Sequence, residues 1–497
     1  MFVGRRAELA RIIKRVDDIK RTGRGRSLAI RGRRQVGKSR LVQELCDRAG
    51  LPYVFYTAVK GVSATEAIGL FHRTLRDSSL VAGADPGLLP EAAPAGGWGE
   101  MLRLLTTALP DAPSIVVLDE LPWLAEQDPA FDGHLQVSWD RLMAHKPVLL
   151  LLLGSDLHMM RRLTEYDRPF YGRADNMILG PLNPAETAAV TGLAGADAID
   201  AHLITGGLPG LALRWPSGVP ALDFLVDEVI DPTSGLFSVP EQALNSEFPT
   251  PDTARRVIES VGGAGSRTFS NIAVDASGKP TPLSPGTLAP LLQRLHEQKH
   301  LLAVDRPLSA RPSKLAQYRI ADSNLRLYLA ILREVQQQVL RGRDQAGLAI
   351  LAARWSSWRG NAVEPIIREA LTNAAFAGAL PFTGAQEPGV QKPGAQEPGV
   401  QEVGSWWNRQ GTVEVDLVGA DRAPIATTVP FAGSIKWQDG PFDRHHLAEL
   451  RRDAPSIPGF DPATSGLVVV SHSGTDLPAG EVDVVWSPAD VVASWPA

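Results

Sequence analysis

The stretch Gly32-Arg33-Arg34-Gln35-Val36-Gly37-Lys38-Ser39 indicates the fold type of the first third of the chain. It matches the pattern G-x-x-x-x-G-K-[ST] and lies between a predicted strand at 27–30 and a predicted helix at 38–48. The glycines let the backbone curl so that successive N–H groups point at one anion, and the helix start adds partial positive charge. The sequence therefore predicts a phosphate-binding loop, or P-loop.

The residue types in this loop suit a nucleoside triphosphate with its metal ion. Lys38 is expected to bridge the β- and γ-phosphates, and the Ser39 hydroxyl suits Mg²⁺, which prefers oxygen ligands. ATP and Mg²⁺ are thus the predicted cofactors. The loop residues expected to contact the nucleotide are Gly32, Arg33, Arg34, Gln35, Val36, Gly37, Lys38, Ser39 and Arg40.

Around the loop, short apolar runs alternate with longer helical patterns. Such strands need cover on both faces, which is typical of a parallel sheet flanked by helices, so the first third is predicted to be a doubly wound α/β domain. The predicted strands are 27–30, 53–56, 115–118, 148–153 and 177–179. Residues 82–98, rich in Gly, Pro and Ala, are predicted to form a long surface loop.

Two carboxylates follow the predicted strand 115–118. They lie at its C-terminal end, where open α/β sheets bind ligands, and this is typical of a Walker B motif. Asp119 is expected to hold Mg²⁺ through its water shell, and Glu120 to orient and polarise the water that attacks the γ-phosphate. An apolar strand that ends in Asp-Glu is a weak signal alone, because solvated strand ends look similar, but the Lys38 loop strengthens it.

Further candidate catalytic residues follow the next strands. Ser155 comes at the end of the predicted strand 148–153 and is a candidate to hydrogen-bond the attacking water; helix capping by Ser155 or Asp156 is the alternative. Arg168 and Arg173 precede the last strand, and an arginine here could reach the γ-phosphate in its own or a neighbouring subunit. We select Arg173 for this role, with a surface salt bridge as the alternative for both arginines.

The remaining chain is predicted to contain a helical lid, a winged helix and a second α/β unit. The winged-helix prediction rests on a helix that begins at Thr253, a short helix near 269–274 and a longer helix at 285–298, followed by strands at 301–304 and 318–320. The last unit has a helix at 362–375 and strands at 413–418, 425–429 and 467–470. The predicted domains are 1–182, 183–250, 251–330 and 331–497. A five-residue repeat at 384–403 has little to bury and is predicted to be a disordered insert; a partner-binding extended segment is the alternative.

Composition limits the class of protein. The chain has 497 residues, 44% of them hydrophobic and 21% charged, and a net charge of −5, so it has no global basic field for nucleic acid. Cys46 is the one cysteine, which excludes an intramolecular disulfide and fits a reducing compartment. The N-terminus lacks a signal-peptide pattern and the longest apolar run is too short to span a bilayer, so a cytoplasmic protein without a membrane partner is predicted.

Several motifs together resemble those of the archaeal-type ATPases, P-loop proteins of the STAND branch near AAA+. The resemblance covers about the first 215 residues, and it implies that Val3 and Gly4 line the adenine pocket and that the helical region near Gly206 closes over the nucleotide as a lid. The motifs are Phe2-Val3-Gly4-Arg5 with Glu8-Leu9, the P-loop, Leu118-Asp119-Glu120, Gly154-Ser155, Tyr171-Gly172-Arg173 and Gly206-Gly207-Leu208-Pro209.

The last part of the chain resembles restriction-endonuclease-like (PD-(D/E)xK) domains that are fused to such ATPases. The resemblance rests on Trp358-Arg359-Gly360 with Glu364, Trp406-Trp407-Asn408-Arg409, Glu414-Val415-Asp416 and Ser434-Ile435-Lys436-Trp437. It implies a nuclease site of Glu364, Asp416 and Lys436, but Ser434 stands where the second metal-binding acid belongs. One carboxylate fewer lowers the expected metal affinity, so we favour a degenerate nuclease fold over an active one.

The function predicted from the sequence is Mg²⁺-dependent ATP hydrolysis that drives or gates a conformational switch of the C-terminal domains. The alternatives are an ATP-regulated DNA nuclease and a nucleotide-sensing scaffold that binds DNA or protein without hydrolysis. DNA contact through the winged helix would use Arg294, His296 and Lys299, and DNA contact, a protein partner and oligomer formation are left open. His445 and His446 are interpreted as solvated side chains rather than metal ligands.

Overall fold

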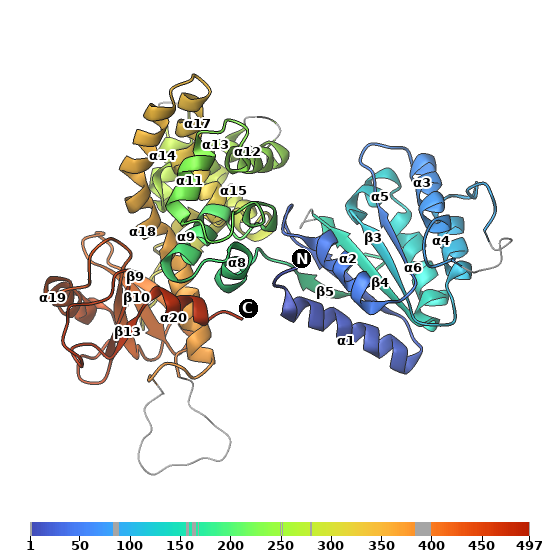
Figure 1. The fold of residues 1–497 in the computed structure, drawn as a ribbon. Coiled ribbons are helices and arrows are strands. Elements are labelled where there is room, and N and C mark those ends of the chain that lie inside the picture. The colour runs from blue at the N-terminus through green and yellow to red at the C-terminus, as the bar shows by residue number, and fades with distance from the viewer. Residues whose placement is uncertain are drawn as a thin grey trace, which may run out of the picture. The chain divides into compact units, whose positions relative to one another are not determined.

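The computed structural model describes residues 2–82, 89–155, 159–161, 166, 168–248, 250, 252–278, 281–382 and 399–496. It divides into two compact units (Figure 1). The first contains Met1–Pro181 with Leu208–Gly210, and the second contains Leu182–Gly207 with Leu211–Ala497. Most of the predicted repeat insert, and residues 83–88 of the predicted loop at 82–98, lie outside the described residues.

The first unit is built on a five-stranded parallel sheet in the order β2-β3-β4-β1-β5. All five predicted strands are confirmed; the last begins two residues earlier than predicted. Their bounds are β1 Arg26–Arg31, β2 Tyr53–Thr57, β3 Ser114–Asp119, β4 Val148–Gly154 and β5 Asp175–Ile178. Every residue of β3 and β4 is buried, as their unbroken apolar sequences require.

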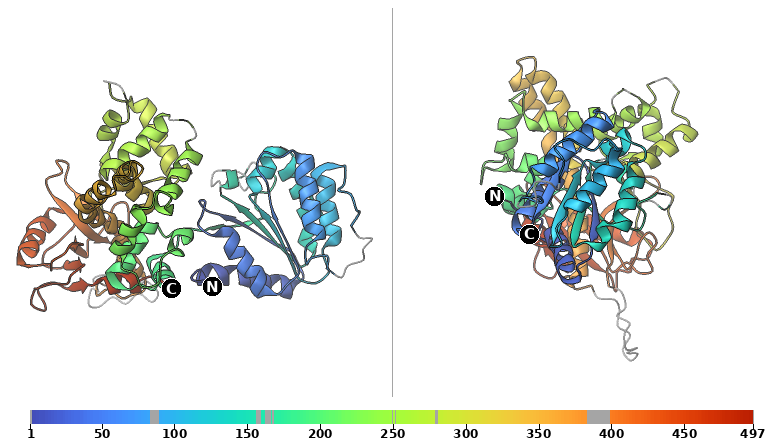
Figure 2. Two further views of the ribbon diagram at one scale, coloured as in Figure 1. Left: turned by 45° about the horizontal axis from the view of Figure 1, so that its top comes forward. Right: turned by 90° about the vertical axis from the view of Figure 1, so that its right-hand side faces the viewer.

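Helices cover both faces of this sheet (Figure 2). One face carries α1 and α2, and the other carries α3 to α6, which pack around a cluster with Phe71, Trp98 and Phe131 at its centre. The helices are α1 Arg6–Thr22, α2 Lys38–Ala49, α3 Ala64–Arg76, α4 Gly97–Ala108, α5 Leu121–Gln127 and α6 Phe131–Arg141. The doubly wound α/β fold predicted from the sequence is thus confirmed.

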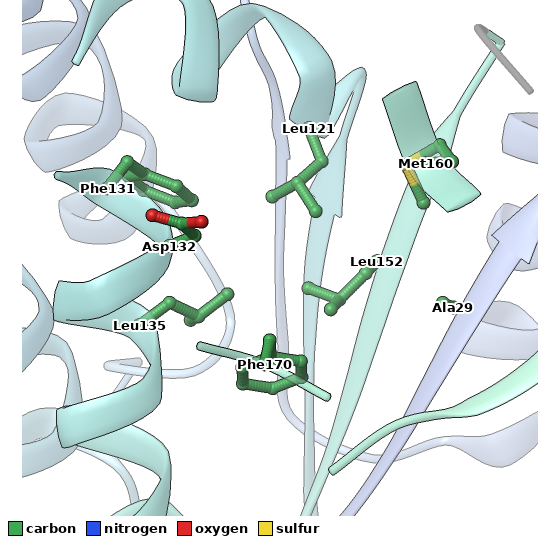
Figure 3. A pocket seen from close by; sticks show the side chains of 8 residues that line it. All are labelled: Ala29, Leu121, Phe131, Asp132, Leu135, Leu152, Met160 and Phe170. Atoms are coloured by element: carbon green, nitrogen blue, oxygen red, sulfur yellow. The ribbon is translucent and has the colours of Figure 1, made fainter. Parts of the chain in front are cut away.

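An apolar cavity lies between the sheet and helices α5 and α6 (Figure 3). Its lining residues are Ala29, Leu121, Phe131, Asp132, Leu135, Leu152, Met160 and Phe170. None of them belongs to the predicted nucleotide-binding set, so this cavity is a feature of the core and not the phosphate site.

The second unit begins with a helical region and continues in the order predicted for a winged helix. The helical region has α8 Pro184–Thr191, α9 Gly195–Thr205, α11 Ala221–Val229 and α12 Gly235–Glu247, together with α10 Pro209–Ala212, whose first two residues belong to the first unit. Next come α13 Thr253–Ala264, β6 Arg267–Thr268, α14 Phe269–Asp275, α15 Pro285–Gln293, the π-helix η3 Arg294–Gln298, β7 Leu302–Asp305 and β8 Gln317–Ile320. The strands pair antiparallel in the order β6-β8-β7, so the predicted helix at 285–298 differs only in its π-helical end.

The C-terminal part is a long helix followed by a mixed sheet in the order β13-β12-β11-β10-β9. The predicted helix at 362–375 is the end of the 33-residue α18. The elements are α16 Ser323–Leu327, η4 Tyr328–Leu332, α17 Arg333–Val339, α18 Asp344–Phe376, β9 Glu402–Trp407, β10 Glu414–Ala420, β11 Phe431–Lys436, α19 Arg444–Asp453, β12 Gly466–Ser471, β13 Val484–Trp486 and α20 Pro488–Ala493. Strands β11, β12 and β13 run parallel, whereas β9, β10 and β11 pair antiparallel.

The predicted strand at 425–429 is wrong. Those residues form a loop, because the Asp421 carboxylate accepts the backbone N–H groups of Thr427 at 2.8 Å and Thr428 at 3.0 Å, and the strand begins at Phe431. Strands β9 and β13 were not predicted.

Inside the second unit, the predicted domains pack on one another. The segment after β7 lies along β9, where the Leu308 N–H donates to the Ser405 carbonyl at 2.9 Å and the Leu308 side chain joins the core around Trp406 and Val418. The loop between β7 and β8 therefore contributes Leu308 to the hydrophobic core of the C-terminal sheet.

Within the described parts of the chain, no helix combines the length and the apolar character that crossing a lipid bilayer requires.

Candidate functional site

The P-loop leaves the end of β1 and enters α2 in a conformation that its glycines permit. Gly37 has φ 89°, and Gln35 also lies in the left-handed region at φ 65°. A Cβ on Gly32 would stand 2.4 Å from the Leu179 carbonyl oxygen, so only glycine fits where the loop passes the segment after β5.

Lys38 lies in the hollow of this loop. Its ammonium donates to the Gly32 carbonyl at 2.8 Å and to the Arg33 carbonyl at 3.0 Å, and the residue is 6% exposed. Burial lowers the pKa of Lys38, and the nearby charges of Glu120 and Asp119 oppose that shift. The loop thus holds a desolvated cation against its own carbonyl oxygens at the start of α2, which suits a phosphate group.

Ser39 and Asp119 meet at the neighbouring position. The Ser39 hydroxyl donates to Asp119 Oδ2 at 2.7 Å, and burial raises the pKa of Asp119 although this hydrogen bond lowers it. A hydroxyl beside a carboxylate is a pair of hard oxygen ligands, so these residues fit Mg²⁺. The Thr57 hydroxyl at the end of β2 lies 3.5 Å from the same carboxylate oxygen. No motif predicts this contact, because Thr57 ends an ordinary apolar strand.

Glu120 and Ser155 also come together. The Ser155 hydroxyl donates to Glu120 Oε2 at 2.9 Å and its backbone N–H approaches the same oxygen at 3.3 Å. Glu120 has φ 54° at the start of α5, so its side chain leaves β3 in a direction that ordinary strand geometry would not give. Ser155 was expected to contact water, and in this structure it holds the carboxylate expected to activate that water.

The two arginine candidates are placed differently. Arg173 makes a bidentate ion pair with Asp140, at 2.8 Å for both contacts, and its carbonyl accepts the hydroxyl of Ser27 at the start of β1. The P-loop follows the other end of β1, roughly 16 Å away at ~3.3 Å per residue. Within its own subunit Arg173 is therefore a structural ion pair, which corrects its assignment to the γ-phosphate there; Arg168 lies 3.8 Å from Asp132.

The other predicted nucleotide-binding residues lie in the loop itself, at the start of α2 and ahead of α1. Val3 and Gly4 are half-buried ahead of α1, Arg33 is half-buried, and Val36 is buried. Arg34 and Gln35 are exposed, as are Ser39 and Arg40 at the start of α2, where Arg40 pairs with Glu44 at 3.3 Å.

Comparison with known proteins agrees with this geometry. Residues 1–148 match the AAA ATPase domain. This part of the chain is an AAA ATPase domain. No curated protein matches the sequence.

Among solved structures, the chain is similar to a Walker-type ATPase of Pyrococcus abyssi, with 17% identity and a TM-score of 0.45; the match covers 66% of this chain and 96% of that one. It is also similar to the ORC2 protein of Aeropyrum pernix in its ADPNP–ADP complexes, with 14% identity and a TM-score of 0.43, covering 69% and 95%.

Outside the AAA ATPase domain, the structure brings Glu364 and Asp416 close together on α18 and β10, but an arginine joins them. Arg368 donates to Glu364 Oε2 at 2.7 Å and to the Asp416 carbonyl at 2.9 Å. Burial raises the pKa of Glu364 to about 7, with Arg368 opposing the shift and Asp416 adding to it.

The other side chains of this nuclease-like site also have hydrogen-bond partners within the protein. Asp416 Oδ2 accepts the Ser434 hydroxyl at 3.0 Å and the Ile435 N–H at 2.9 Å. Lys436 turns to His446, 2.8 Å from its Nε2, and His446 in turn lies 2.7 Å from Asp443. Among the described residues, no group of three or more His, Cys, Asp and Glu side chains is placed to hold a metal ion. The residues present do not fit a nuclease metal site, because Arg368 supplies the positive charge there.

Two of the three residues predicted to contact DNA from the winged helix also have partners within the protein. Lys299 pairs with Glu247 at 2.7 Å, and His296 Nδ1 lies 2.9 Å from the Leu302 carbonyl oxygen, whereas Arg294 is exposed.

Proposed function

We propose that the AAA ATPase domain binds Mg²⁺-ATP and hydrolyses it. The observation that carries this proposal is the convergence of Lys38, the Ser39–Asp119 pair and the Glu120–Ser155 pair at the C-terminal edge of one parallel sheet. Motifs that follow separate strands thus supply a cation for the phosphates, a pair of metal ligands and a carboxylate that can act as a base.

Each side chain has a definite task in this proposal. Lys38 would exchange the Gly32 and Arg33 carbonyls for phosphate oxygens, and Ser39 and Asp119 would hold Mg²⁺, which would supply positive charge for phosphoryl transfer. Glu120 accepts a hydrogen bond from the attacking water and takes its proton. Ser155 holds the Glu120 carboxylate in place, so it acts through Glu120.

We further propose that the nucleotide state controls the second unit. Two features support this: the segment after β5 passes the P-loop so closely at Gly32 and Leu179 that no side chain fits between them, and this segment leads into the second unit at Leu182. A change in the conformation of the P-loop would therefore displace the segment that connects the two units.

Steady-state ATP turnover by the full chain tests the proposal, with Glu120→Gln and Lys38→Ala as variants, each with and without double-stranded DNA. Lys38→Ala should abolish ATP binding in a calorimetric titration, and Glu120→Gln should bind ATP but lose turnover. Turnover that does not depend on Glu120 would overturn its role. Tight binding with negligible turnover in the wild type would instead favour the non-hydrolysing scaffold, and turnover that rises with DNA would make the winged helix the next target.

A further inference from the structure

Arg5 is a buried arginine that the proposed chemistry does not use. It stands directly before α1, is 5% exposed and has φ 60°, a left-handed conformation that arginine rarely adopts. A long cationic side chain held in this way requires compensating contacts.

Its guanidinium group binds carbonyl oxygens of two distant segments. Nη2 donates to the Val36 carbonyl at 3.1 Å and to the Gly180 carbonyl at 2.7 Å, and Nη1 donates to the Pro181 carbonyl at 3.3 Å. Glu8 on α1 lies 3.4 Å from Nη1 and balances part of the charge. One side chain thereby ties the N-terminal segment, the P-loop and the end of the segment after β5 together.

The Val36 contact fixes the direction of a loop N–H group. The Val36 carbonyl and the Gly37 N–H belong to one peptide plane, and in a trans peptide they point in opposite directions. Because Arg5 holds the Val36 carbonyl, the Gly37 N–H is fixed on the opposite side of the same peptide plane.

The Gly180 and Pro181 contacts hold the residues just before Leu182, where the chain first enters the second unit. Arginine suits both tasks because its planar fork has five donors at fixed angles, whereas a lysine ammonium is a single point charge that cannot span these carbonyls in the same geometry.

We propose that Arg5 is a positioning residue of the ATP site. It holds the Val36–Gly37 peptide in the orientation that binds phosphate, and it connects the P-loop to residues 180–181, so that nucleotide binding orders these residues. This inference rests on the proposed ATP binding.

The test compares Arg5→Lys and Arg5→Gly with the matched variants Arg6→Lys and Arg6→Gly, since Arg6 is the exposed neighbour on α1. Glycine tolerates φ 60°, so Arg5→Gly removes the guanidinium without adding backbone strain. Two quantities are measured on the full chain: ATP affinity by calorimetry with Mg²⁺, and ATP-dependent protection of the amides of residues 179, 180 and 182 in hydrogen exchange.

Both Arg5 variants should bind ATP about tenfold more weakly and lose the ATP-dependent protection, while the Arg6 variants match the wild type. Wild-type affinity and protection in Arg5→Lys would overturn the inference, as would a lower melting temperature with an unchanged ATP-induced increase, because that pattern indicates a merely structural role. If Arg5→Gly does not fold, Arg5→Lys decides. Failure of the wild type to bind ATP would refute the proposed function itself, and it is seen before any variant is compared.

Discussion

Replacing Arg359 by methionine should destabilise the second unit by about 3–5 kcal/mol, because it leaves a buried carboxylate without its cation. Arg359 on α18 donates to Asp200 on α9 at 3.0 Å, and the two residues are 8% and 4% exposed. Methionine fills most of the volume of the arginine stem, so the decrease in stability reports the loss of the charge rather than the creation of a cavity.

The other contacts of Asp200 do not replace this partner. Trp437 Nε1 lies 3.4 Å from Asp200 Oδ1, which is a long hydrogen bond from a donor without charge. Asp439 lies 3.6 Å from Arg359 but is 92% exposed, so it contributes little. Burial raises the pKa of Asp200 and Arg359 opposes that shift, so the variant should raise the pKa further.

The raised pKa of Asp200 makes the loss of stability in Arg359→Met depend on pH, and it fixes the direction of that dependence. A carboxyl whose pKa is raised in the folded protein binds a proton that the unfolded chain has already released, so stability falls as the pH rises from the unfolded pKa to the folded pKa. Arg359→Met should therefore be most destabilised at neutral pH and recover part of the loss as Asp200 becomes protonated in acid.

Calorimetric unfolding of the full chain measures this effect. For a unit of roughly 300 residues, 3–5 kcal/mol corresponds to about 5–8 °C in melting temperature. The matched control is Arg354→Met on the same helix, which breaks the half-exposed Arg354–Glu334 pair at 2.8 Å and should cost less than about 1 kcal/mol. Equal shifts in the two variants, or no recovery when Asp200→Asn is added to Arg359→Met, would refute the reasoning.

Three further changes test other parts of the structure. Ser155→Ala removes the hydroxyl that holds Glu120 and should lower kcat about 10- to 100-fold with little change in KM for ATP, measured by steady-state turnover. Gly32→Ala places a Cβ 2.4 Å from a carbonyl oxygen and should weaken ATP binding at least about tenfold in calorimetry, whereas Gly69→Ala on α3, with nothing nearer than 3.9 Å, should not. Glu364→Gln should flatten the pH profile of stability: with a folded pKa of about 7, the wild type loses stability relative to the variant as the pH rises from 5 to 8, which denaturation at several pH values checks.

The sequence predicts the first unit well because its strands are buried on both faces and so consist of unbroken apolar runs, of which 148–153 is the longest example. The C-terminal sheet gives weaker signals. Strand β9 reads Glu-Val-Gly-Ser-Trp-Trp and β13 has three residues, so neither shows a clear period. The stretch at 425–429 is rich in β-branched residues, yet the side chain of Asp421 holds it in a loop.

The site shows the same division. Lys38, Ser39, Asp119 and Glu120 carry recognisable local patterns, and the structure brings them to one edge of the sheet. The contacts that cross between segments have no local pattern. Arg5 lies 31 residues from Val36 and 175 from Gly180, so only the folded chain shows that they meet.

The buried Asp200–Arg359 pair also bears on what a nucleotide-driven movement could involve. Asp200 belongs to the region expected to act as a lid at 183–250, and Arg359 to the region expected to be a separate C-terminal domain. Leu308 gives a second such link, because it leaves the winged-helix elements and packs in the C-terminal core. Separating these regions would expose a buried charge pair and part of a hydrophobic core, which costs several kcal/mol. A switch driven by ATP would therefore move the second unit as one body, with flexing confined to the segments that join it to the AAA ATPase domain.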